Sequence, residues 1–167
     1  MLFRSGGQPQ GTGGTVGGTN SGTCSFKFSV TTKSYGGRFR PENVGAIYIE
    51  SSSGGFVKSL NVWGRTRLGN LTDWEQLSGG NTTDAITSAT RGNAGTISGS
   101  WDCTDTNRQP VADGQYKVCC SFQEDDALPF FGPAPKQACV DFSKGTGPFT
   151  NNAPDQSYFT QMTLTMQ

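Results

Sequence analysis

The stretch VGAIYIESSSGGFVKSLNVW, residues 44–63, decides the fold. Two runs rich in apolar and β-branched residues flank SSSGG, a cluster of small turn-forming residues. Runs of this kind are typical of strands, and a short connection that contains glycine predicts that the two strands form an antiparallel hairpin. A β-rich domain is therefore the starting hypothesis.

Strand patterns continue on both sides of this hairpin. The alternation at the start of the domain places Phe26, Phe28 and Val30 on one face of a strand. Further strands are predicted at residues 24–32, 96–103, 114–122, 136–144 and 157–166. The second and third of these are expected to form another hairpin, because turn-forming residues and Asp113-Gly114 separate them. About seven short strands predict an all-β antiparallel sandwich.

One long insert, residues 64–95, interrupts this pattern. Thr72-Asp73-Trp74-Glu75 has the form of a capping box, which predicts a short helix from Thr72 through about Leu77. Gly79-Gly80 is expected to end the helix, and the remainder is predicted to be a loop. Long loops within compact domains commonly carry function, so the insert is the first place to look for a site.

The N-terminal segment, residues 1–22, has a different composition from the rest. Gly, Thr and Ser dominate it, and it has too few apolar residues to form a core, which predicts a disordered linker before a domain at residues 23–167. Its apolar start is too short for a membrane span or a secretory core. A Gly/Thr-rich stalk is typical of tethered exported domains, although a segment added by cloning has the same composition. We expect a secreted, periplasmic or cell-surface location.

Composition also restricts the chemistry. Lys plus Arg and Asp plus Glu number 13 each, and no basic block is present, so nucleic acid and membrane insertion are not expected. The chain contains no histidine, which excludes Ser-His-Asp and Cys-His catalysis and any histidine-ligated metal within it. Function must rest on carboxylates, hydroxyls, thiols, arginines or an attached cofactor.

The five cysteines lack CxxC spacing, which favours disulfides over zinc. If 115–123 and 136–143 are neighbouring antiparallel strands, Cys120 is expected opposite Cys139, and Cys24 and Cys103 would form a second bridge. Cys119 then points to the other face and is the expected free thiol. Reduced cysteines buried in a core remain the alternative.

The sequence DAITSAT, residues 84–90, lies in the long insert and supports a resemblance to known families. The hairpins around VGAIYIESSSGGFVKSL and SWDCTDTNRQPVADGQYKV are similar to those of bacterial Ig-like domains of the flagellar hook-capping type. DAITSAT resembles the D-x-x-[ST]-[GS]-A-T signature of proteins that carry covalent FMN. Together these features resemble a family of exported bacterial Ig-like proteins predicted to be flavinylated and to act in extracytosolic electron transfer.

This resemblance implies a fold, a cofactor and a set of roles. The fold would be Ig-like or fibronectin-III-like, and the cofactor would be FMN, joined by a flavin transferase through a phosphoester to the Thr90 hydroxyl. Ser88 and Ala89 would keep the segment small enough for the transferase cleft, Thr87 would fix the local turn, and Asp84 would be read by the transferase or lie near its metal. The chain would then be a redox carrier with an unknown partner protein at the cell envelope, not an enzyme.

Aromatic and basic residues near the motif are further candidates. Trp63, Trp74 and Tyr48 offer rings on which a flavin could stack, with plain core packing as the alternative for each. Residues Arg65, Arg67 and Arg91 are candidates for pairing with the FMN phosphate, with a solvated surface position as the alternative.

Other functions remain open at this point. A structural or adhesive Ig-like surface domain without a cofactor would use the insert to bind another protein. The alternative to a cofactor motif at DAITSAT is a Ser/Thr turn in which Asp84 caps a helical turn. A hydrolase would need Asp102 and Asp105 as an acid pair, but the resemblance to Ig-like domains implies hairpin and turn positions for both residues.

Overall fold

The computed structural model describes residues 24–127 and 132–167, so the predicted linker lies outside the described residues. In this part of the chain the structure contains nine strands, one α-helix and one 3-10 helix. In chain order they are β1 Phe26–Thr32, β2 Val44–Ser51, β3 Phe56–Trp63, η1 Arg65–Asn70, α1 Thr72–Ser78, β4 Ile86–Ser88, β5 Thr96–Trp101, β6 Gly114–Gln123, β7 Lys136–Lys144, β8 Phe149–Ala153 and β9 Phe159–Met166.

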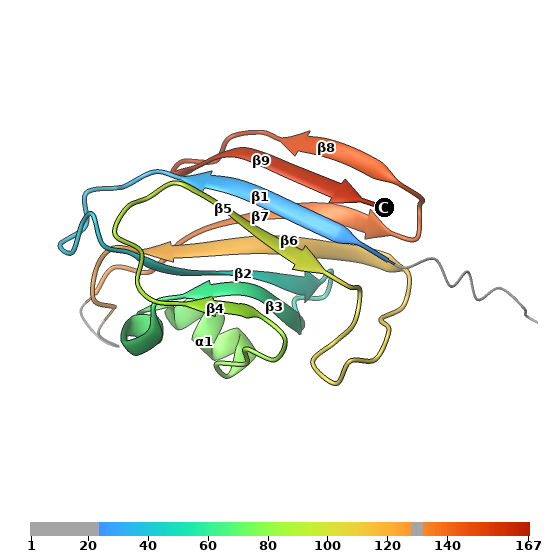
Figure 1. Ribbon diagram of the computed structural model, residues 1–167, viewed down its shortest axis with the longest axis horizontal. Coiled ribbons are helices and arrows are strands. Elements are labelled where there is room, and N and C mark those ends of the chain that lie inside the picture. The colour runs from blue at the N-terminus through green and yellow to red at the C-terminus, as the bar shows by residue number, and fades with distance from the viewer. Residues whose placement is uncertain (1–23, 128–131) are drawn as a thin grey trace, which may run out of the picture.

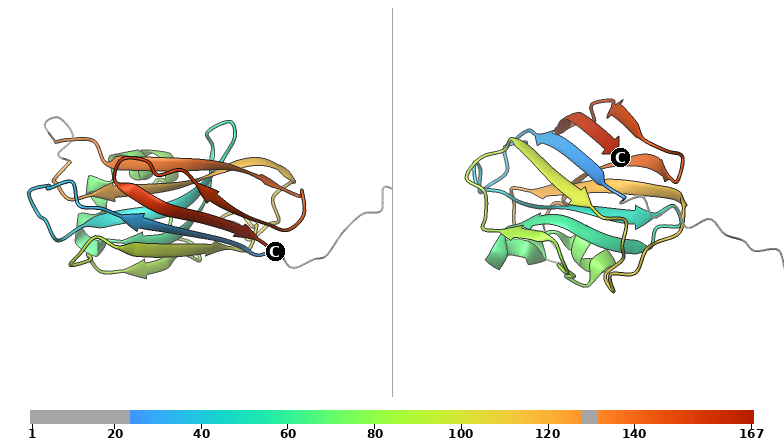
Figure 2. Two further views of the ribbon diagram at one scale, coloured as in Figure 1. Left: turned by 90° about the horizontal axis from the view of Figure 1, so that it is seen from above. Right: turned by 45° about the vertical axis from the view of Figure 1, so that its right-hand side comes forward.

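The strands form two sheets that pack face to face (Figure 1), so the predicted all-β sandwich is confirmed. One sheet has the order β5-β1-β9-β8, and the other has the order β4-β3-β2-β6-β7. Neighbouring strands are antiparallel except for β3 and β4, which run parallel. Figure 2 shows the two layers from the side, with α1 lying outside the five-stranded sheet.

Aromatic side chains fill the space between the sheets. Phe26 stacks on Phe142 with ring centroids 4.4 Å apart, and Trp101 packs edge-on against both rings. The alternation predicted for the first strand is confirmed, since Phe26, Phe28 and Val30 are all fully buried. Burial of this many large apolar groups is the main favourable contribution to the stability of the sandwich.

A second apolar cluster lies on the outer face of the five-stranded sheet. Trp74 of α1 is fully buried there, together with Leu71 and Tyr48. The helix is also held by a polar contact, because the hydroxyl of Ser121 on β6 donates to the Asp73 carboxylate at 2.7 and 2.8 Å. The insert is therefore docked on the sheet along the segment that contains η1 and α1.

The structure confirms one end of the predicted helix and corrects the other. Its C-terminus is as expected, because Gly79 adopts a left-handed conformation and its N–H donates to the carbonyl of Glu75 at 2.9 Å. The predicted capping box is wrong: Leu71 occupies the N-cap position, and no side chain caps the helix. Asp73 is used for tertiary docking on Ser121 instead.

The predicted pairing of residues 96–103 with residues 114–122 is also wrong. The strand β5 pairs with β1, whereas β6 pairs with β2 and β7 in the other sheet. The connection between β5 and β6 crosses from one sheet to the other. Alternation along the sequence does not distinguish such a crossing from a hairpin.

Two short polar strands, β4 and β8, were not expected because neither has an apolar alternation.

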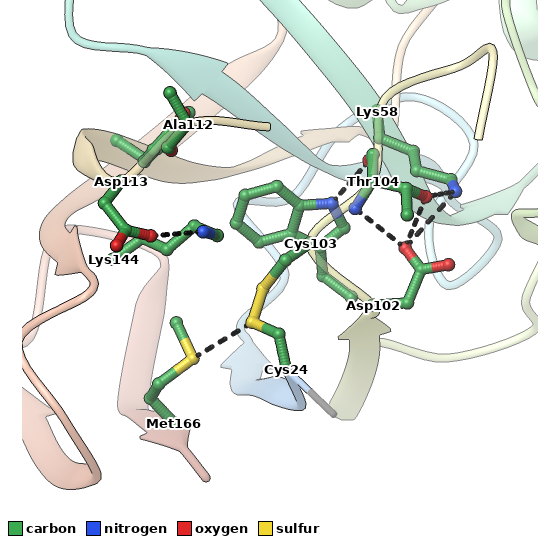
Figure 3. Close-up of a disulfide and its surroundings, with 11 residues drawn as sticks. Cys24, Lys58, Asp102, Cys103, Thr104, Ala112, Asp113, Lys144 and Met166 are labelled. Atoms are coloured by element: carbon green, nitrogen blue, oxygen red, sulfur yellow. Dashed lines mark hydrogen bonds and ion pairs between the residues drawn. A yellow bond between two sulfur atoms is a disulfide. The ribbon is translucent and has the colours of Figure 1, made fainter. Parts of the chain in front are cut away.

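The structure contains two disulfides, of which one was predicted correctly. The Cys24–Cys103 disulfide is confirmed and joins the start of β1 to the segment after β5 (Figure 3). The predicted Cys120–Cys139 disulfide is wrong by one residue. Cys119 lies opposite Cys139 and is bonded to it. Cys120 pairs with Ala138 in the strand register and is the buried free thiol. A shift of one residue exchanges the two faces of a strand, so the error also exchanged the two cysteines.

The Cys24–Cys103 disulfide is expected to contribute strongly to stability. It closes a loop with a sequence separation of 79 residues, against 20 for Cys119–Cys139. By the chain-entropy relation, replacing Cys24 and Cys103 together with serine should lower the free energy of unfolding by about 4 kcal/mol. Denaturant titration measures this loss. The Cys119→Ser, Cys139→Ser variant should lose about 1 kcal/mol less, and an equal or larger loss there would contradict the argument.

Candidate cofactor-attachment site

The predicted attachment motif lies on β4 at the edge of the five-stranded sheet, as Figure 1 shows. Thr87 pairs with Val62 and Ser88 pairs with Trp63 of β3 in parallel register. Thr87, Ser88 and Ala89 are exposed, so the segment is extended and accessible from solvent. The alternative in which Asp84 caps a helical turn is wrong, because the backbone after Asp84 is a strand.

Backbone hydrogen bonds hold the chain on both sides of Thr90. The N–H of Gly64 donates to the carbonyl of Ser88 at 3.1 Å, and Asn43 and Arg91 exchange two backbone bonds at 2.9 and 3.0 Å. The Thr90 side chain is half-buried, and its hydroxyl has only a long contact of 3.5 Å with the carbonyl of Gly64. The backbone at Thr90 is thus fixed while its hydroxyl has no short hydrogen bond among the described residues.

The chain leaves β3 at Gly64, the residue whose N–H bonds to the carbonyl of Ser88. Its φ of 136° is disfavoured for residues with a side chain, and a Cβ there would lie 2.6 Å from a methyl carbon of Val44. Glycine therefore allows the chain to leave β3 and enter η1 while its N–H stays bonded to Ser88.

Asn43 connects this backbone pairing to the core. Its side chain is completely buried, and its Oδ1 accepts a 2.9 Å hydrogen bond from the Trp63 indole N–H. Its Nδ2 donates to the carbonyl of Pro41 at 3.1 Å. A buried amide with both ends paired has one strongly preferred orientation, so Asn43 holds Arg91 in a fixed position beside the core.

The aromatic platform expected near the motif is not available in this structure. Trp63 is 1% exposed and Trp74 and Tyr48 are 0% exposed, so protein atoms cover their rings. Trp74 donates its indole N–H to Ser59 at 3.0 Å, and Ser59 in turn donates to the carbonyl of Asn81. The interpretation of Trp63 and Trp74 as stacking residues is therefore corrected: both support the insert from inside.

Asp84, at the start of the motif, is held by two cations. Its carboxylate accepts bonds of 2.8 and 3.0 Å from the Arg108 guanidinium, and its Oδ2 lies 3.4 Å from Lys58 Nζ. Its backbone is in the left-handed region, with φ at 59°. The hydrogen bonds from Arg108 are the main reason that the pKa of Asp84 falls from 3.8 to about 2.

Arg108 and Lys58 were not identified from the sequence. Lys58 is buried on β3 and also donates to the Thr104 hydroxyl at 2.7 Å, as Figure 3 shows. Arg108 lies in the segment after the Cys24–Cys103 disulfide, where the Asp105 carboxylate accepts two backbone N–H bonds. Asp105 is thus a turn residue as expected. Arg108 lies 24 positions from Asp84, and only tertiary structure joins them.

The outer side of β4 borders a groove with a volume of about 470 Å³. Its lining residues are Val62, Arg65, Leu68, Thr82, Thr87, Ser88 and Ala89. A volume of this size lies within the range of small-molecule sites. The motif therefore forms one wall of a groove, and exposed Arg65 contributes a cation to it.

The other two candidate arginines lie elsewhere. Arg67 packs over the Phe39 ring at 4.0 Å and lies within 4.0 Å of carboxylates of Glu42 and Asp126. Arg91 is fixed through its backbone by Asn43, and its side chain makes no ion pair with the described residues. Of the three, Arg65 is the one that lines the groove.

The geometry defines a disulfide-bonded β-sandwich that presents a threonine-ended segment on an exposed edge strand. Residues 25–124 match the family model described as a predicted periplasmic protein (DUF2271), and the chain belongs to that family. The matched range includes the motif and the partners of Asp84. Comparison with curated proteins and with solved structures finds no significant match. No helix in the described residues is long and apolar enough to cross a membrane.

The ion pair at Asp84 predicts a defined acid dependence. Because its pKa in the folded protein is below the ordinary value, the pair stabilises the fold above pH 3.8, and this contribution is lost as the pH falls towards about 2. Arg108→Gln should raise the pKa of Asp84 towards 3.8 and flatten the loss of stability in that window. Carboxyl NMR titration and unfolding at several pH values measure both effects.

The matched control is Lys27→Gln, which removes one positive charge from an exposed position on β1. This variant should leave the titration of Asp84 unchanged. An unchanged Asp84 pKa in Arg108→Gln would show that the guanidinium does not cause the shift.

Proposed function

We propose that the protein is an extracytosolic electron carrier that holds FMN covalently on Thr90. The observation that carries this proposal is the position of the DAITSAT motif on an exposed edge strand, with Thr90 at its end and a groove along its side. Membership of a predicted periplasmic family and two disulfides are consistent with a location outside the cytosol.

The residues around Thr90 fit an attached flavin phosphate. The Thr90 hydroxyl has no short hydrogen bond to the described residues that would compete with attachment. Arg65 on the wall of the groove supplies a positive charge suited to a phosphate, and Ser88 and Ala89 are small enough to leave the segment open. Thr87 continues the pairing with β3, which holds the segment straight.

Attachment would take place in the active site of a separate flavin transferase. The Thr90 oxygen would form a bond to the phosphorus on the flavin side of flavin adenine dinucleotide. The phosphorus–oxygen bond of the diphosphate would break, adenosine monophosphate would leave with the electron pair, and the hydroxyl proton would pass to the transferase. Asp84 would position the start of the motif through Arg108 and Lys58, since its carboxylate is already occupied by them.

Bound FMN would supply one- and two-electron redox chemistry, and the chain would supply its position and electrostatic surroundings. Arg65, which lines the groove, would favour negative charge on the cofactor. The electron donor and acceptor would be partner proteins at the cell envelope. In this proposal the chain is a carrier with no substrate site of its own.

Attachment is tested by co-expression of the exported protein with an active bacterial flavin transferase. The intact mass of the parent protein should increase by one FMN, and Thr90→Ala should remain at its unmodified mass because it lacks the acceptor oxygen. In-gel flavin fluorescence gives a second measurement. Thr82→Ala, which alters a threonine on the same groove outside the motif, should be modified like the parent.

Two results would overturn the proposal. A parent protein that stays unmodified while a known substrate of the same transferase is modified would exclude Thr90 as an acceptor. Modification of Thr90→Ala to the same extent as the parent would place the flavin on another residue.

A second candidate function is that of a structural or adhesive domain without cofactor. The observation that favours it is Ile86 on β4, the large hydrophobic side chain that is most exposed among the described residues, at 61%. An exposed apolar residue on an edge strand is a suitable contact for another protein. Under this function Thr90→Ala would leave partner binding unchanged, and Ile86→Ser would weaken it.

A further inference from the structure

The Cys119–Cys139 disulfide lies beside the carboxyl group of Glu50, a residue at the end of β2. Glu50 Oε1 is 3.5 Å from Cys119 Sγ, and the ligand atoms of Glu50, Cys119 and Cys139 all lie within 4.8 Å of one another. Cys119 is fully buried, whereas Cys139 is partly exposed on the edge strand β7. Of the two residues Cys139 is therefore the more exposed, and Cys119 lies next to a proton donor or acceptor.

We propose that Cys119–Cys139 is a redox-active disulfide, reduced by a dithiol, and that Glu50 exchanges a proton with Cys119. This inference is independent of flavin attachment, since it uses neither Thr90 nor the groove beside β4. It assigns the outer face of the five-stranded sheet a second, separate chemical role.

The reaction is a balanced thiol–disulfide exchange. A thiolate of the dithiol attacks Cys139 Sγ and forms a mixed disulfide, the bond to Cys119 breaks, and its electron pair leaves on Cys119 Sγ. The protonated Glu50 carboxyl gives its proton to that sulfur. The second thiol of the reductant then attacks the mixed disulfide and releases Cys139, so that the dithiol is oxidised as the protein disulfide is reduced.

The strands around this disulfide do not depend on it for their pairing. The ladder between β6 and β7 runs from Gly114 opposite Lys144 to Phe122 opposite Lys136, with Cys119 and Cys139 near its middle. Hydrogen bonds on both sides of the cysteines hold the strands in register after the sulfur–sulfur bond opens. The Cys24–Cys103 disulfide lies just beyond the last pair of the β1–β5 ladder, Phe26 opposite Trp101, so this ladder flanks the bridge on one side only. We therefore expect the two disulfides to respond differently to reductant.

The surroundings of Glu50 support its role. Burial raises the pKa of Glu50, and Asp73 adds to this effect while Lys117 opposes it. A raised pKa keeps part of the carboxyl population protonated at higher pH, where more of the reductant is thiolate. Lys117 of β6 and Asp73 of α1 face Glu50 from neighbouring elements, with Asp141 of β7 beyond Lys117. Tyr48 is the titratable group on the same strand, β2.

Cys120 does not take part in this exchange. It is completely buried on the opposite face of β6, within the core between the sheets, and burial raises the pKa of its thiol. A buried thiol with a raised pKa is a poor nucleophile. The redox pair is therefore Cys119 with Cys139.

The first test measures which disulfide opens. The whole oxidised protein is equilibrated with increasing ratios of reduced to oxidised dithiothreitol, free thiols are alkylated, and peptide mass spectrometry identifies the modified cysteines. Cys119 and Cys139 should be alkylated together at ratios that leave Cys24 and Cys103 bonded, with the near-UV circular dichroism of the fold retained. Reduction of both disulfides at the same ratio, or only with loss of the fold, would overturn the proposal.

The second test concerns Glu50 itself. The rate of reduction per dithiothreitol thiolate should fall by about tenfold as the pH rises through the pKa of Glu50, because the carboxylate form has no proton to give and repels the thiolate. Glu50→Gln should lack this step, whereas Glu75→Gln on the exposed side of α1 should keep it. The same step in Glu50→Gln as in the parent would exclude Glu50 as the proton partner.

Discussion

Hydrogen bonds to β3 are the interaction on which the candidate site depends. This one strand holds Asp84 through Lys58, supports Asn81 through Ser59, pairs with β4 over three residues and continues into the Gly64 contact with Ser88. A bulge in the pairing of β3 with β2 brings Leu60 and Trp63 to the core face, while Ser59 and Val62 lie on the outer side, where η1 and α1 pack. The position of the motif is thus set by a largely buried strand of the sheet.

The sandwich has an apolar cluster on each side of its five-stranded sheet, and this arrangement explains how a long insert remains ordered. Leu71 and Trp74 close the outer cluster, so η1 and α1 contribute apolar burial that offsets the entropy cost of ordering the segment. The part of the insert that comes after α1 is polar and has little to bury. It is fixed instead by backbone bonds to Gly64 and Asn43 and by the ion pair at Asp84.

The sequence was sufficient to predict the fold class, the β2–β3 hairpin, the end of α1 and the Cys24–Cys103 bridge, because each depends on local pattern or on simple elimination. The role of Arg108 was not accessible in this way, since a salt bridge between residues far apart has no local signal. The strand β4 was missed because it is short and polar, and its pairing comes from the neighbour rather than from its own composition. The error at Cys120 arose because the length of the connection to β7 does not determine register.

The two edges of the five-stranded sheet differ in how much backbone they leave open to another chain. At one edge, β7 is nine residues long, with Lys136, Asp141 and Lys144 along it and a side-chain bond from Gln156 to the carbonyl of Cys139. At the other edge, β4 has three residues. Long unprotected edges favour unwanted strand addition, and charged side chains or short strands prevent it. The edge formed by β4 is therefore accessible to a partner that binds its side chains. It is too short for a second copy of the chain to extend the sheet there.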